Sequence, residues 1–158
     1  MSSSREIRAF LDKYEPAIVE QVQAARKHLA KLFPRGYELV YDNYNALVFG
    51  LSSTERASDA IVSVAAYPRW VTLFFLKGAA LSDPAGLLQG EGSTVRGIRL
   101  SPPEVLESKA VTALIKQARR SHAAAFAQAP PLSTVVKSVS AKQRPRRPPS
   151  KPRRKRGT

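Results

Sequence analysis

A run of short apolar segments between residues 37 and 100 constrains the fold most, because helical patterns flank it on both sides. The segments are rich in β-branched and aromatic residues, and polar or Gly- and Pro-containing stretches separate them. We expect strands near Ala46–Leu51 and in "DAIVSVAAY", "WVTLFFLKG" and "VRGIRL", with an earlier extended piece around Leu39–Tyr41. The tight "YPR" turn predicts an antiparallel hairpin whose core holds Trp70, Phe74 and Phe75.

The flanking segments have the spacing of amphipathic helices. Apolar residues recur at intervals of three and four from Ile18 to Phe33, after Pro16 and before Pro34. A second stripe follows Pro103 and ends near Phe126, and a short helix opens the chain. Helices segregated from an antiparallel sheet predict an α+β, two-layer domain with N-terminal helices and a C-terminal helix.

The positive charge is concentrated at the C-terminal end. The formal net charge is +14, of which residues 128–158 carry +10 with no Asp or Glu, while residues 1–127 carry +4. Six of the twelve prolines also lie in the last segment, and little of it is apolar. A segment of this composition buries too little apolar surface to offset its ordering entropy. We therefore expect a folded domain over 1–127 and a disordered basic tail over 128–158.

The tail carries the strongest functional signal. Prolines keep a chain extended, and each Lys or Arg that neutralises a phosphate releases counterions. This pattern predicts non-specific association with nucleic acid, DNA or RNA. A solubilising tail and a tail that binds another acidic surface remain alternatives. The predicted phosphate contacts are Lys142, Arg144, Arg146, Arg147, Lys151, Arg153, Arg154, Lys155 and Arg156.

Two further segments carry candidate ligand-binding groups. The stretch "GLLQGEGSTVRGIRL" fails both the phosphate-loop and the dinucleotide spacing, so it is either a turn or a small anion site on Arg96 and Arg99. The cluster around Asp42 is either a pocket or a hydrogen-bonded turn with packed tyrosines. Its candidate pocket residues are Tyr41, Asn43, Tyr44 and Asn45.

Other classes of protein are disfavoured by what the sequence lacks. There is no cysteine, no secretory leader pattern and no apolar run of membrane-spanning length, so we expect a cytoplasmic, nucleoid-associated protein without a membrane span. His28 and His122 have no partner at ligand spacing. We therefore predict no metal site, no cofactor and no catalytic residue, and an uncharacterised small-molecule enzyme remains an alternative.

One stretch resembles a known family. "VTLFFLKGAALSDPAGLLQGEGSTVRGIRL", Val71 to Leu100, is similar to the signature of the YdhG-like bacterial domains of unknown function. The resemblance covers Pro16 to Phe126 more loosely and implies an α+β sandwich. Gly97 stands where many members carry His. Some members are labelled frataxin-like iron chaperones, which makes iron carriage an alternative function. The scattered carboxylates here, interleaved with basic residues, do not favour a site of clustered oxygen ligands.

Overall fold

Helices precede and follow a run of strands in the computed structural model, which describes residues 2–149. Pro16 suits the first turn of its helix because a proline lacks only a donor that is unpaired there anyway. Ser108 caps another helix, since its hydroxyl accepts from the backbone N–H of Val111 at 3.2 Å. The α-helices are α1 (Ser2–Leu11), α2 (Pro16–Leu32), α3 (Lys109–Arg120) and α4 (Ala123–Gln128).

Six strands form one mixed sheet in the order β5-β4-β3-β2-β1-β6. The first five strands are joined as antiparallel neighbours, and the β3–β4 hairpin closes where the Tyr67 N–H donates to the Trp70 carbonyl at 2.9 Å. The strands are β1 (Tyr37–Asp42), β2 (Leu47–Ser52), β3 (Ala60–Ala66), β4 (Val71–Phe75), β5 (Arg96–Arg99) and β6 (Ser133–Val139).

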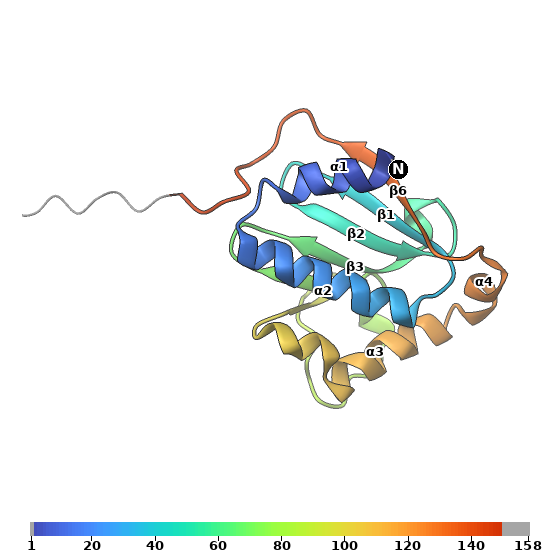
Figure 1. Cartoon of the computed structure of the whole chain (residues 1–158). Helices are drawn as coiled ribbons and strands as arrows, with labels where there is room; N and C mark the ends of the chain where they lie inside the picture. The colour runs from blue at the N-terminus through green and yellow to red at the C-terminus, as the bar shows by residue number, and fades with distance from the viewer. Residues whose placement is uncertain (1, 150–158) are drawn as a thin grey trace, which may run out of the picture.

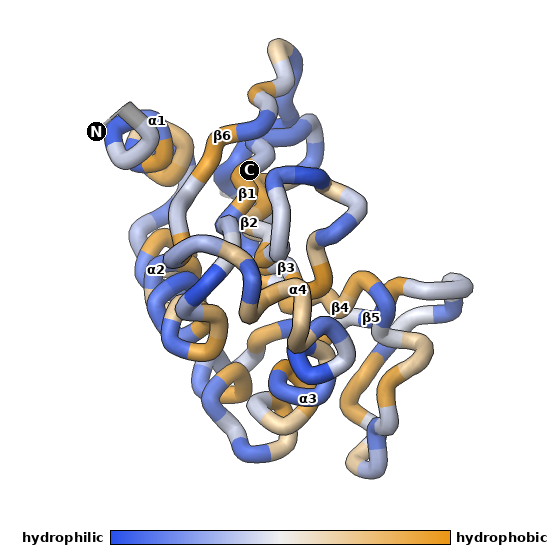
Figure 2. The backbone as a smooth tube through the Cα atoms, turned by 90° about the vertical axis from the view of Figure 1, so that its right-hand side faces the viewer, coloured by the Kyte–Doolittle hydropathy of each residue, from blue (hydrophilic) through white to orange (hydrophobic). Residues whose placement is uncertain are grey.

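The helices and the sheet form two layers, as an α+β domain requires. Figure 1 shows α1, α2 and α3 over one face of the sheet, and Figure 2 shows the strands in sequence from β6 to β5 with these helices to one side. The core lies between the layers, and burying one such side chain contributes roughly 1.5–3 kcal/mol. Its fully buried members include Val22, Leu29, Val40, Phe49, Val64, Leu73 and Ile115.

The prediction that residues 128–158 form a disordered tail is wrong for much of that segment. Residues 133–139 form β6, which pairs in parallel with β1, so the sheet is mixed rather than antiparallel. The physical reason is that β1 would otherwise present an unpaired edge, and the short "TVV" run supplies both ladder hydrogen bonds and the core-packed side chain of Val136. The Thr134 hydroxyl also donates to Glu38 Oε1 at 2.7 Å. A domain boundary at residue 127 would divide β6 from the sheet to which it belongs, so the folded domain extends beyond the expected boundary.

Candidate nucleic-acid interface

Asp42 ends β1 with a carboxylate that points toward the helices. Side chains alternate along a strand, and Val40, two residues before Asp42, lies in the core on the helix side. The carboxylate is fully buried, so it needs cationic partners. Lys13 Nζ lies 2.6 Å from Oδ2, and Arg146 Nη2 lies 2.9 Å from Oδ1. One aspartate thus joins the segment after α1 to a residue more than one hundred positions further along the chain.

Arg146 is buried, which corrects its predicted role as a phosphate contact. The residue is only 4% exposed, and its guanidinium donates to Asp42, to the Asn43 carbonyl and to the Tyr44 carbonyl. Its guanidinium also lies 5.8 Å from the centre of the Tyr14 ring. A guanidinium held in this way serves as the counterion of Asp42, so it is not free to bind a phosphate from solution.

Burial and charge shift the pKa values of two groups in this cluster. Burial alone would raise the pKa of Asp42, but its bonds to Lys13 and Arg146 outweigh burial and hold that pKa below its ordinary value. Burial raises the pKa of Tyr14 to about 12, which keeps its hydroxyl protonated. That hydroxyl donates to the Ala66 carbonyl at 2.8 Å and accepts from the Leu47 N–H at 3.2 Å. Both groups hold β1, β2 and β3 against α1 and α2.

The chain after β6 is fixed to the turn between β1 and β2 at several points. Gln143 Nε2 donates to the Asp42 carbonyl at 3.1 Å, and its Oε1 accepts from Lys13 Nζ at 2.6 Å. The Arg144 backbone N–H donates to the Tyr44 carbonyl at 2.8 Å. Arg147 donates to the backbone carbonyls of Lys13 and Tyr14. This part of the predicted tail is therefore a strap across one end of the sheet.

The strap brings two predicted sites together, and we call the result the tail–turn surface. The turn contributes an aromatic ring, since Tyr44 is 49% exposed, and two exposed amides. The strap contributes exposed cations, two of which have side chains with no hydrogen bond among the described residues. The members of the tail–turn surface are Asn43, Tyr44, Asn45, Lys142, Arg144 and Arg147. Cations beside an exposed ring and amides can bind phosphate and contact a base.

The other candidate residues lie elsewhere. Tyr41 is half-buried on β1, facing away from the helices, and its buried hydroxyl has no partner within residues 2–149. Arg96 and Arg99 are on β5, at the opposite edge of the five-stranded antiparallel part, so they do not line one small pocket together with the Tyr41–Asn45 cluster. Arg96 Nη1 donates to the Gly92 and Val95 carbonyls of its own loop.

The glycine-rich stretch is a connection between strands. Gly86 and Gly90 have φ angles of 66° and 134°, in the region that favours glycine. Gln89 then pairs with Gly97, where each backbone N–H donates to the other residue's carbonyl at 2.9 Å. The segment leads directly into β5 rather than into a helix. These observations support the interpretation of the stretch as a turn.

The remaining sequence predictions concern metal binding, a membrane span and the last basic residues of the tail. Residues 2–149 hold no group of three or more His, Asp and Glu side chains arranged to bind a metal ion, and none of their helices is long and apolar enough to cross a bilayer. The basic residues outside the described part of the chain are Lys151, Arg153, Arg154, Lys155 and Arg156.

No family model, curated protein or solved structure matches the chain. The resemblance to the YdhG-like family therefore stays a prediction.

Sequence reasoning missed the Asp42–Lys13–Arg146 cluster. The signal was present, because Asp42 directly follows the apolar run Leu39–Tyr41 and a buried carboxylate requires a cation. The sequence did not identify the cation, since twenty-six Lys and Arg residues were available. A second ion pair was missed for the same reason: Arg26 donates to both carboxylate oxygens of Glu38, at 2.7 and 2.8 Å.

Proposed function

We propose that the protein associates with nucleic acid through the tail–turn surface and the basic residues that follow it. The observation that carries the proposal is the strap itself. The buried Arg146 and the half-buried Gln143 fix its path, so that Lys142 and Arg144 are held exposed, and the Arg144 backbone is bonded to Tyr44. Cations on a backbone that is already fixed lose less chain freedom on binding than cations on an unattached chain.

The charge around this surface favours a polyanionic partner. Asp42 is neutralised by two cations, and the chain continues beyond residue 149 with five more Lys and Arg residues and no carboxylate. Binding of this kind is electrostatic and largely independent of base sequence. A cytoplasmic, nucleoid-associated location is part of the proposal. Membership of the YdhG-like family is also part of the proposal. Its support is the resemblance over Val71–Leu100, which spans β4, a connection with a short 3-10 helix at Gly78–Ala80, and β5.

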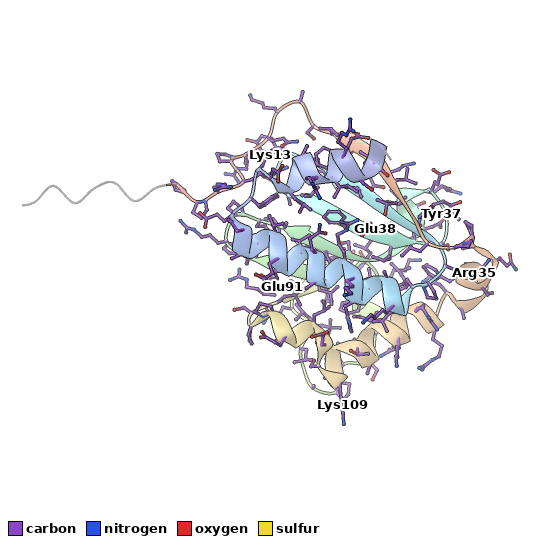
Figure 3. All side chains as sticks on the ribbon, viewed as in Figure 1. Lys13, Arg35, Tyr37, Glu38, Glu91 and Lys109 are labelled. Carbon is purple, nitrogen blue, oxygen red and sulfur yellow. The ribbon has the colours of Figure 1, made fainter. Side chains whose placement is uncertain are left out.

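The test is fluorescence anisotropy of a labelled 20-nucleotide DNA, with the full chain at two salt concentrations. Lys142→Glu with Arg144→Glu should weaken binding at least ten-fold, because both exposed side chains leave the phosphates. The matched control is Lys109→Glu with Lys116→Glu on α3, which changes the net charge equally. Lys13 bonds to Gln143 of the strap, and Figure 3 shows Lys109 on the opposite side of the molecule from Lys13. Equal losses in both variants, or no binding by the full chain, would contradict the proposal.

A further inference from the structure

The sheet face opposite the helices carries several aromatic side chains. Val40, Leu73 and Phe75 pack in the core, so alternation places Tyr41 and Phe74 on the other face. In the structure α1, α2 and α3 all lie on the core side (Figures 1 and 2). Both of these side chains are half-buried, and the Tyr41 hydroxyl is buried. The aromatic side chains assigned to this face and its hairpin end are Tyr37, Tyr41, Tyr67, Trp70 and Phe74.

Small residues keep the middle of this face low. Gly50 pairs with Ser63, and Ala65 lies two residues further along β3. On β5, Gly97 leaves room for Phe74, whose ring atoms lie 3.1 Å from the position that a Cβ at residue 97 would occupy. Larger side chains on β1 and β4 flank these positions, and Leu39, Ser63 and Ala65 on the same face are at most 4% exposed, so the exposed aromatic surface lies at the hairpin end of the face rather than in its middle.

Trp70 was expected in the hairpin core, but it is 36% exposed at the turn between β3 and β4. The Arg99 guanidinium lies 4.1 Å from its ring centre, and the Tyr67 ring centre lies 6.0 Å away. Arg99 itself is exposed. The end of the face thus presents an aromatic pair with a cation stacked on it, which can contact a base and its phosphate together.

The charge on this face is complementary to a polyanion. Among the described residues the six strands contain two carboxylates, Glu38 and Asp42, and both are buried and paired on the helix side. The opposite face therefore has no carboxylate at a strand position, while Arg99 provides a positive charge. An apolar peptide would match the rings but not this cation.

The face is continuous with the tail–turn surface. A single cross-strand row runs from Tyr41 through Val48, Ala65 and Thr72 to Arg99, as the strand register shows. Tyr44 follows Tyr41 at the same end of the sheet, because the β1–β2 and β3–β4 turns both lie there. A strand bound at Lys142 and Arg144 could therefore extend across the row toward Trp70.

We propose that the helix-free sheet face binds single-stranded nucleic acid, with bases stacking on Trp70 and neighbouring rings and phosphates meeting Arg99 and the tail–turn cations. This inference rests on the proposed function and names its substrate class. A duplex keeps its bases stacked on one another, so its bases would not reach these rings. Single strands should therefore bind more tightly than duplexes of equal length, and only single strands should contact Trp70.

The chain has one tryptophan, so its fluorescence reports directly on this face. The full chain is titrated with a 20-nucleotide oligothymidine and, separately, with a 20-base-pair duplex. We expect the single strand to quench Trp70 and the duplex to leave it largely unchanged. Trp70→Ala should weaken single-strand binding, measured by anisotropy, on the order of ten-fold, while Trp70→Phe retains most of the affinity. Urea unfolding of both variants verifies that this exposed position leaves the fold intact.

The outcomes separate this inference from the proposed function. If the single strand binds without quenching Trp70, and Trp70→Ala binds like the unaltered chain, the sheet face is not the site. The proposed function still stands in that case, provided that Lys142→Glu with Arg144→Glu weakens binding. If the full chain binds neither probe, both proposals fail. Equal quenching by the duplex would overturn the assignment to single strands.

Discussion

At the scale of the residue, Asp42 is the position where one substitution should cost most. Its carboxylate is fully buried between Lys13 and Arg146. Asp42→Asn leaves the Arg146 charge buried without its partner, and the free energy of unfolding should fall by about 3 kcal/mol. Urea denaturation measures this loss. The control is Asp12→Asn, an exposed aspartate whose substitution should change stability by less than about 0.5 kcal/mol.

The same residue predicts a dependence of stability on pH. The pKa of Asp42 is lower in the folded protein than its ordinary value, so its ion pairs stabilise the fold fully above about pH 4. That stability is lost as the pH falls through the folded pKa. Asp42→Asn should therefore show a shallower loss of stability on acidification than the unaltered chain. If both proteins lost stability equally steeply as the pH fell, Asp42 would not titrate as inferred.

At the scale of the element, β6 decides where the domain ends. A chain ending at Ala127 loses a strand, the Thr134–Glu38 bond and the counterion of Asp42. We expect it to unfold at a temperature at least 10 °C lower than the full chain, because several kcal/mol of stabilising contacts are removed. A chain ending at Pro149 keeps all these contacts and should unfold within a few degrees of the full chain. Circular dichroism on heating compares the three. If the chain ending at Ala127 melted at the same temperature as the full chain, β6 would contribute little to the stability of the fold.

At the scale of the whole molecule, the residues after Pro149 should act through charge alone. They add five Lys and Arg residues. On single strands each phosphate contact contributes about 0.7 to the slope of log affinity against log salt concentration. Removing residues 150–158 should therefore lower that slope by up to about 3.5 while leaving the melting temperature unchanged. The control replaces the same five residues by Gln at full length, and it should match the shortened chain. An unchanged slope would show that these residues contact no phosphate.

The sequence by itself determined the general pattern of elements from α1 to α3 and the balance of charge. Periodicity is a local property, so the stripes of α2 and α3 and the apolar runs of β2 to β5 were predicted from spacing and composition. Only the tertiary structure decided that the tail contributes β6, that Arg146 is a partner of Asp42, and that the Arg144 backbone is bonded to Tyr44. These features depend on contacts between residues about one hundred positions apart. Local composition does not encode such contacts, since many basic residues could have paired with Asp42 and only the packed sheet brings Arg146 to it.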